Sequence, residues 1–153
     1  MALYLVQHGI SLPKDIDPDQ GLSDEGVSEV KRIAGVAKTY HVPVSRIQHS
    51  GKKRAHHTAE IFASALTPGR AVEQRSGLNP LDDVVAVAGT LNSSDNLMLV
   101  GHLPFMERLT AYLVTKAVDS LVFKFQNGGI LCLEANPDAA SYFIKWALMP
   151  KIE

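Results

Sequence analysis

Two histidines each stand directly after an apolar run that is typical of a buried β-strand. His8 follows Leu3-Tyr4-Leu5-Val6-Gln7, and His102 follows Leu99-Val100-Gly101. Ligands of an open α/β sheet bind outside the carboxyl ends of its parallel strands, so both imidazoles can face one crevice. A solvated strand end is the alternative for His8, and a helix cap is the alternative for His102.

A cationic segment lies between these histidines in the chain, Ser50-Gly51-Lys52-Lys53-Arg54-Ala55-His56-His57-Thr58. Its pattern is typical of a turn from a strand into a helix. Cations are unfavourable near a helix N-terminus unless an anion compensates, so Arg54 predicts a phosphate site. The alternatives are an ion pair between Arg54 and a neighbour such as Glu60, and a solvated face formed by Lys52 and Lys53.

Other motifs carry less information. Gly51-Lys52-Lys53 lacks the spacing of a Walker motif, and His56-His57 with Glu60 lacks the spacing of a zinc-binding helix, so we expect neither a metal nor a cofactor. Asp82 and Asp83 follow Pro80, where they can serve as an acid or base or simply begin a helix.

Composition limits the class of protein. A chain of 153 residues with 46% hydrophobic content predicts a single domain over residues 1–153. The net charge of -1 excludes an overall basic field for nucleic acid or an anionic membrane.

The single cysteine, Cys132, lies in an apolar stretch, and we expect it to fill the core in a reducing compartment. No segment approaches the ~20 apolar residues of a membrane helix, and the N-terminal run is too short for a signal peptide, so we expect a soluble, cytoplasmic protein.

Strands alternate with helices along the chain, which predicts an α/β fold. Strands are expected at residues 3–7, 44–49, 71–74, 97–100, 129–134 and 141–148, with turns at 92–96 and 135–138. Helices are expected from a Ser23 cap to near Tyr40, from a Ser50 cap to Thr67-Pro68-Gly69, from Asp82-Asp83 through Leu91, and after Pro104. This order predicts a three-layer α/β/α sandwich with a mostly parallel mixed central sheet, closed by an antiparallel pair.

Four segments resemble, in order, the motifs of the histidine phosphatase superfamily: Leu3 to Gly9, Leu22 to Gly26, Ser50 to Thr58, and Val100 to Pro104. The chain is most similar to the small SixA-like phosphohistidine phosphatases, and the resemblance covers nearly its whole length. It implies that His8 attacks phosphorus, that a phosphohistidine enzyme intermediate forms, and that water then releases phosphate. It also implies that His102 and Arg54 bind the phosphoryl oxygens, with no metal required.

The chain departs from this pattern at two phosphate-binding positions. Gln7 stands where the superfamily has arginine before the nucleophile, and Gln20 stands where a second arginine usually precedes the Leu22 motif. A glutamine amide still donates hydrogen bonds but carries no charge, and losing one such donor costs on the order of 3 kcal/mol. We therefore expect Gln7, Gly9 and Gln20 to contact the substrate together with Arg54 and His102. The candidates for replacing the lost charge are the cations Lys14, Lys52, Lys53, His56 and His57.

The resemblance implies a phosphatase of signal transduction that acts on phosphohistidine in a protein, with a histidine-containing phosphotransfer protein as the expected partner and phosphate as the product. Short connections without a long lid leave room for a protein surface to present its phosphoryl group. Two alternatives remain open: a small-molecule phosphomonoesterase, and a degenerate member that binds phosphate or phosphoprotein without efficient turnover.

Overall fold

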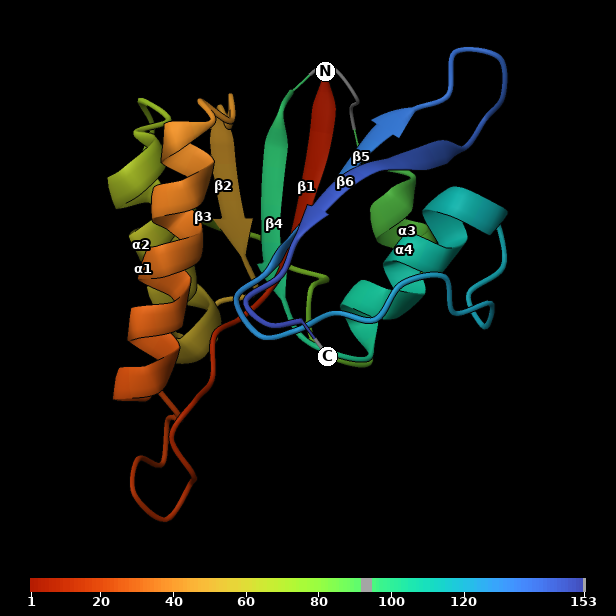
Figure 1. Cartoon of the computed structure of the whole chain (residues 1–153). Helices are drawn as coiled ribbons and strands as arrows, with labels where there is room; N and C mark the ends of the chain where they lie inside the picture. Colours follow the sequence, from red (N-terminus) through yellow and green to blue (C-terminus); the bar gives the residue numbers. More distant parts are fainter. Residues whose placement is uncertain (92–94, 153) are drawn as a thin grey trace.

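The structure is a computed structural model that describes residues 1–91 and 95–152, and a six-stranded sheet forms its centre (Figure 1). The strands are β1 (Ala2–Gln7), β2 (Arg46–His49), β3 (Glu73–Gln74), β4 (Leu97–Gly101), β5 (Ile130–Ala135) and β6 (Tyr142–Leu148). Their order is β3-β2-β4-β1-β5-β6. The first four of these are parallel to one another, whereas β5 is antiparallel to both β1 and β6.

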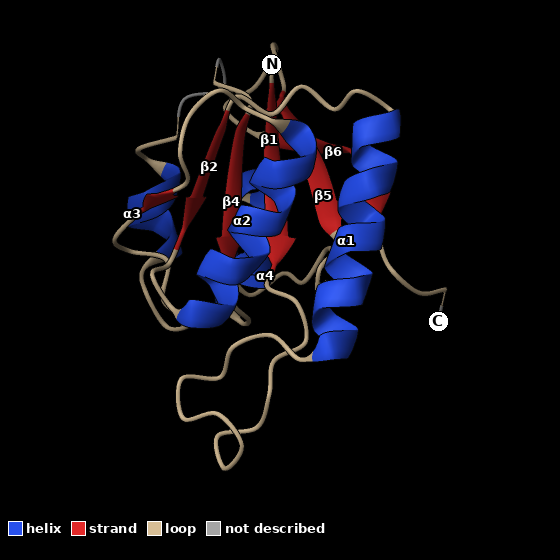
Figure 2. Ribbon diagram, turned by 90° about the vertical axis from the view of Figure 1, so that its left-hand side faces the viewer, coloured by secondary structure: helices blue, strands red, loops and turns tan. Residues whose placement is uncertain are grey.

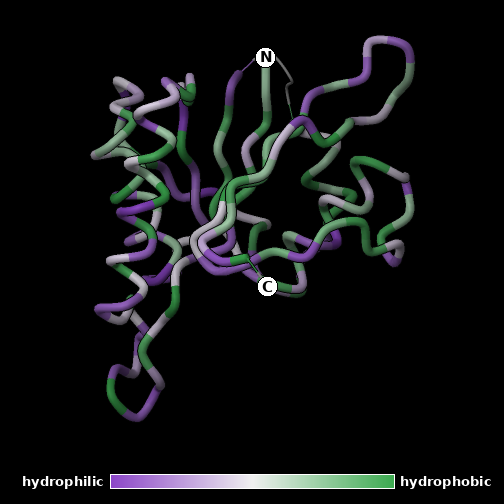
Figure 3. Tube along the Cα trace, in the orientation of Figure 1, coloured by the Kyte–Doolittle hydropathy of each residue, from purple (hydrophilic) through white to green (hydrophobic). Residues whose placement is uncertain are grey.

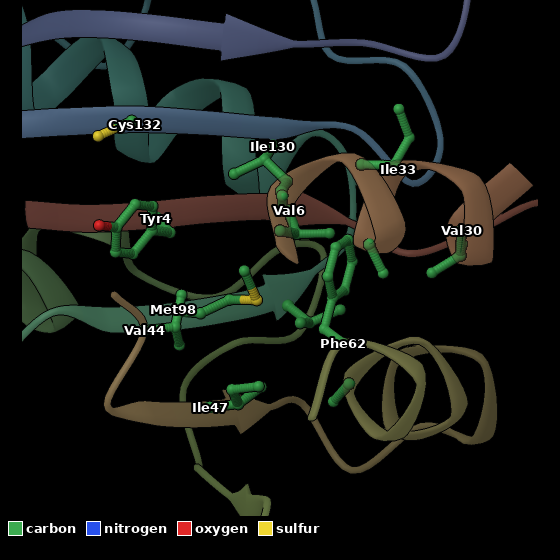
Figure 4. Packing of buried hydrophobic residues seen from close by; sticks show 14 of the residues in the cluster. Tyr4, Val6, Val30, Ile33, Val44, Ile47, Phe62, Met98, Ile130 and Cys132 are labelled. Atoms are coloured by element: carbon green, nitrogen blue, oxygen red, sulfur yellow. The ribbon is translucent and has the colours of Figure 1, made fainter. Parts of the chain in front are cut away.

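Helices cover both faces of the sheet, which confirms the expected three layers (Figure 2). They are α1 (Asp24–Thr39), α2 (Lys53–Leu66), α3 (Val84–Ala88) and α4 (Phe105–Thr115). Successive side chains of a strand point to opposite faces, so β1 sends Tyr4 and Val6 toward α1 and α2 while Leu3 and Leu5 enter the second core with α3 and α4. Figure 4 shows the first of these cores, with Phe62 of α2 against Val6. Cys132 is buried in the same core, as expected.

The first helix follows the sequence expectation closely. The Ser23 side chain accepts a hydrogen bond from the Gly26 N–H, and Tyr40 ends the helix as its C-cap. Hydrophobic and hydrophilic residues alternate along α1 (Figure 3), because only one face contacts the sheet. Among the described helices, none is long and apolar enough to cross a membrane.

Several element boundaries differ from the prediction. The second strand begins at Arg46 rather than Val44, the third covers only Glu73–Gln74, and α3 ends before Leu91, which packs against the core outside the helix. The residue that caps α2 was predicted incorrectly: Lys52 is the N-cap and makes no side-chain cap bond, because the Ser50 hydroxyl lies against His102 instead. The predicted turn at 92–96 lies in part outside the described residues.

The carboxyl ends of β1, β2 and β4 meet at one edge of the sheet, where the loop at 11–21 projects away from the body of the molecule (Figures 1 and 2). Asp17 holds this loop in shape by accepting from the Gly21 N–H at 2.8 Å. It also pairs with the Lys53 ammonium at 2.9 Å. The predicted loop therefore forms a wall beside the start of α2.

Candidate active site

His8 stands directly beyond the end of β1 and is held there through its backbone. Its N–H donates to the Gly101 carbonyl at 3.0 Å, and its carbonyl accepts from the Asn127 side-chain amide at 2.9 Å. The next residue is fixed as well, since the Gly9 N–H donates to the Thr58 hydroxyl at 2.9 Å. Groups from β4, from α2 and from the segment before β5 therefore hold the residue that the sequence predicts as nucleophile.

The His8 ring is oriented by a local hydrogen bond. Its Nδ1 lies 2.7 Å from the Gly9 carbonyl oxygen, which can only accept, so Nδ1 carries the proton and the lone pair of neutral imidazole lies on Nε2. Burial lowers the pKa of His8, the Gly9 carbonyl partly opposes this, and the nearby Arg54 charge lowers it further. The ring is therefore neutral near pH 7, with Nε2 available as a nucleophile.

His102 follows β4 and lies beside His8, with ring centroids 5.0 Å apart. It is 2% exposed, and its Nε2 lies 2.6 Å from the Ser50 hydroxyl oxygen. Burial, followed by electrostatic interaction with His8, Arg54 and Lys52, lowers the pKa of His102 to about 3. The two predicted histidines thus share one site, and the helix-cap alternative for His102 is wrong, because Pro104 is the N-cap of α4.

Arg54 lies in the first turn of α2, and its positive charge acts on both histidines. Its carbonyl accepts from the Thr58 hydroxyl at 2.8 Å, and the same Thr58 oxygen holds Gly9, so the nucleophile segment and the cationic helix start are linked through one buried side chain. The alternative ion pair with Glu60 is not formed, because Glu60 pairs with His56 at 3.1 Å. Within residues 1–91 and 95–152, Arg54 has no acidic partner.

A polar cavity of about 630 Å³ opens beside Arg54. Two segments line it, the loop at 14–20 and the start of α2, and its charged or amide-bearing residues include Lys14, Asp19, Gln20, Lys52, Lys53 and Arg54. Lys53 is already neutralised by Asp17. Lys52 makes no ion pair with any described residue, and its charge acts on His102. Of the lysines that line the cavity, Lys52 is therefore the one whose charge also acts on His102.

The two glutamines occupy different surroundings. Gln7 is 9% exposed at the end of β1, and its Oε1 has no hydrogen-bond partner within the described part of the chain. Gln20 lines the polar cavity and has a backbone φ of 50°, held by a bond from its N–H to the Asp17 carbonyl. Neither supplies the positive charge of an arginine.

Asp82 and Asp83 both bind local backbone groups. Asp83 caps α3 by accepting from the Val85 and Ala86 N–H groups, and Asp82 accepts from the Asn79 N–H at 2.9 Å. The contact of Asp83 is that of a residue that begins a helix, whereas Asp82 closes the turn before it. Across the described ranges, no group of three or more His, Cys, Asp or Glu side chains is arranged to hold a metal ion.

Sequence reasoning missed three residues that hold the site together: Ser50, Thr58 and Asn127. For Asn127 a local signal existed, because Asn127-Gly128-Gly129 is a turn sequence and Gly128 has a φ of 80°. Ser50 and Thr58 are the two ends of the cationic segment that resembles a superfamily motif, but their contacts join segments far apart in the chain, so the motif does not give their partners.

Comparison with solved structures shows which folds this chain is similar to. The chain matches the protein histidine phosphatase SixA in complex with tungstate, at 23% identity and a TM-score of 0.84, covering 98% of this chain and 97% of that one. It also matches a mycobacterial glucosyl-3-phosphoglycerate phosphatase in complex with VO3 at 16% identity and a TM-score of 0.72, covering 97% of this chain and 99% of that one. A phosphoserine phosphatase from Entamoeba histolytica bound to phosphoserine matches at 13% identity and a TM-score of 0.73, covering 98% of each chain. No family model and no curated protein matches the sequence.

These likenesses show that the chain has the α/β fold of the histidine phosphatases. SixA shares that fold over nearly the full length of both chains.

Proposed function

We propose that this chain is a phosphohistidine phosphatase of the histidine phosphatase superfamily, with His8 as its nucleophile. The observation that carries the proposal is the hydrogen bond from His8 Nδ1 to the Gly9 carbonyl, which leaves the Nε2 lone pair free beside His102 and Arg54. A fixed, neutral imidazole next to a cation without an acidic partner suits attack on a phosphoryl group.

The reaction proceeds in two displacements. His8 Nε2 forms a bond to phosphorus while the P–N bond of the substrate breaks, and the departing imidazole leaves as a neutral ring because it carried a proton before cleavage. Water then attacks the phosphoryl group as the bond between phosphorus and His8 Nε2 breaks, so the oxygen and both hydrogens of that water leave in dihydrogen phosphate and neutral His8 is restored. Arg54 and His102 stabilise the equatorial oxygens, and Gln7, Gly9 and Gln20 contribute hydrogen-bond donors.

The surroundings favour P–N over P–O cleavage. An alkoxide leaving group needs a positioned acid, and the carboxylates proposed for that role, Asp82 and Asp83, bind backbone N–H groups instead. A leaving imidazole can accept its proton before the bond breaks, since free histidine has a pKa of about 6.5. The open cavity beside Arg54 leaves space for a protein, such as a histidine-containing phosphotransfer protein, to present the group.

The test is to trap the intermediate. Incubation with ³²P-labelled phosphoramidate and rapid quenching is expected to leave an acid-labile label on the wild type and none on His8→Ala, with both proteins folded by circular dichroism. Asp82→Asn and Asp83→Asn are expected to have mild effects on this substrate. Comparable turnover of an alkyl phosphate that is lost in Asp83→Asn would instead identify a phosphomonoesterase.

A second candidate function is binding of phosphate or phosphoprotein without efficient turnover. The observation that favours it is the uncharged pair Gln7 and Gln20 at positions where two arginines would hold the phosphoryl group. Phosphate binding by calorimetry without any trapped label on His8 would select this candidate over the phosphatase.

A further inference from the structure

Ser50 makes a buried contact with His102 that the proposed mechanism does not require. Ser50 follows β2 and His102 follows the neighbouring strand β4, so the sheet brings the two together at its carboxyl edge. The Ser50 oxygen lies 2.6 Å from His102 Nε2, and the two residues are 9% and 2% exposed. Solvent therefore contributes little to the orientation of this ring.

The remaining contacts of this pair bear on where the proton on His102 lies. The Lys52 N–H points to the Ser50 oxygen at 3.4 Å and uses one of its two lone pairs, which leaves the hydroxyl hydrogen free to be donated to Nε2. A neutral imidazole whose Nε2 accepts must carry its proton on Nδ1. That Nδ1 atom is buried and has no hydrogen-bond partner among the described residues.

A buried donor without a partner is costly, and native structures normally satisfy such groups. The ionisable groups that act on His102 are His8, Arg54 and Lys52, none of which offers an anionic acceptor. A phosphoryl oxygen would supply the missing acceptor.

We propose that Ser50 is a positioning residue that holds His102 as the Nδ1-protonated tautomer, so that Nδ1–H donates to a phosphoryl oxygen of the bound substrate. This inference rests on the proposed function for its final step, the contact with substrate. The hydrogen bond between Ser50 and His102, and the tautomer that it sets, are independent of turnover.

The spectroscopic test uses ¹⁵N imidazole shifts of His102 near pH 7. In the wild type, Nδ1 is expected to carry the proton and its resonance to shift when inorganic phosphate is added. Ser50→Ala is expected to give a mixture of tautomers, whereas Ser50→Thr, which keeps the hydroxyl, restores the wild-type pattern. Ser28→Ala, an exposed serine on α1, is the matched control and leaves the spectrum unchanged.

The kinetic test uses phosphoramidate as substrate. Ser50→Ala is expected to lower kcat/KM by about 10- to 100-fold, the loss typical of a misoriented group, while Ser50→Thr retains most activity. In a His102→Ala background, Ser50→Ala adds no further loss, because its effect acts through His102.

Three results would overturn the inference: an unchanged tautomer in Ser50→Ala, an additive loss in the double variant, or an acid-stable label on Ser50, which would make the serine a nucleophile. Its failure is distinguishable from failure of the proposed function. If no label is trapped on His8 but the tautomer still depends on Ser50 and on phosphate, the positioning role stands and turnover is what fails.

Discussion

In the proposed mechanism the neutral form of His8 attacks phosphorus, so the pKa of this ring would set the acid limit of activity. Burial and the Arg54 charge both lower that pKa below the ordinary 6.5. We therefore expect His8 to stay unprotonated, and kcat/KM to be retained, as pH falls below 6.5. An NMR titration of His8 beside the pH profile separates its ionisation from that of the substrate, and a midpoint at or above 6.5 would contradict the prediction.

Substitution of Gln7 tests whether the absence of an arginine at this position limits activity. Gln7→Arg is expected to raise kcat/KM, because the new guanidinium would add charge beside His8, where the proposed mechanism requires an equatorial phosphoryl oxygen. The upper bound is the reverse of losing one such donor, about 2 to 4 kcal/mol. Gln7→Met, of similar size but without a donor, should lower activity. If Gln7→Arg reduces both rate and phosphate affinity, the site is built around glutamine and the deficit is not one of charge.

Lys52 and Lys53 are adjacent lysines in different electrostatic situations. Lys52 is free of an ion pair among the described residues and acts on His102, whereas Lys53 is paired with Asp17. Lys52→Met is therefore expected to weaken phosphate binding about 10-fold, on the order of one charge-assisted contact, and Lys53→Met to change it much less. Calorimetric titration with phosphate at low salt measures both, and equal losses would show that the ion pair with Asp17 does not keep Lys53 from acting on the anion.

The start of α1 is fixed by close packing against the segment that follows β1 and begins with His8. A Cβ on Gly26 would collide with the carbonyl oxygen of Ile10, just after His8 and Gly9, while a Cβ on Gly35 of the same helix meets nothing within 4 Å. Gly26→Ala is expected to lower the free energy of unfolding by about 1–3 kcal/mol through overpacking. Gly35→Ala should raise it by up to about 1 kcal/mol through helix propensity.

Urea denaturation of the two variants checks this pair, and activity adds a second measurement. Gly26→Ala should also lose turnover, because the backbone of Ile10 moves with the segment that holds His8. The same sign of stability change in both variants would show that Gly26 does not contact Ile10 closely.

Elements with a regular spacing of apolar residues, or with cap and turn residues at their ends, could be predicted from the sequence. The α1 cap at Ser23, the C-terminal stop of α2 at Thr67, and the strands that deliver His8 and His102 all follow from local patterns. The Ser50 cap was wrong because a buried bond to His102 outweighs local capping. That bond depends on β2 pairing with β4, a long-range contact that no window of sequence contains.

The order of the strands is what turns separate motifs into one site. Because β4 lies between β1 and β2, the carboxyl ends that bear His8, His102 and Ser50 are neighbours at one edge. The antiparallel strand β5 lies on the other side of β1, and the turn before it supplies Asn127 and Gly128 to hold the His8 and Gln7 carbonyls. One edge thus collects two neutral imidazoles and several cations in a chain whose net charge is only -1.

Stability against pH follows from the same burial. His102 has a pKa of about 3 in the folded chain and 6.5 when unfolded, so between these values the unfolded state binds the extra proton. The contribution of His102 to the free energy of unfolding is therefore fully present above pH 6.5 and is lost as pH drops toward 3. The pKa values of His8 and His49 are lowered too and act in the same direction.

Chemical denaturation at intervals between pH 7 and pH 4.5 measures this slope, which approaches about 1.4 kcal/mol per pH unit for one fully linked histidine. His102→Asn is expected to be less stable at pH 7. Its free energy of unfolding should change less with pH, because the variant lacks the histidine whose pKa is lowered by folding. His41→Asn is the matched control: His41 is exposed at a φ of 56°, which asparagine tolerates, so its slope should match the wild type. Equal slopes in all three proteins would show that His102 titrates alike in the folded and unfolded chain. That result would contradict the burial of His102 beside Arg54 and Lys52.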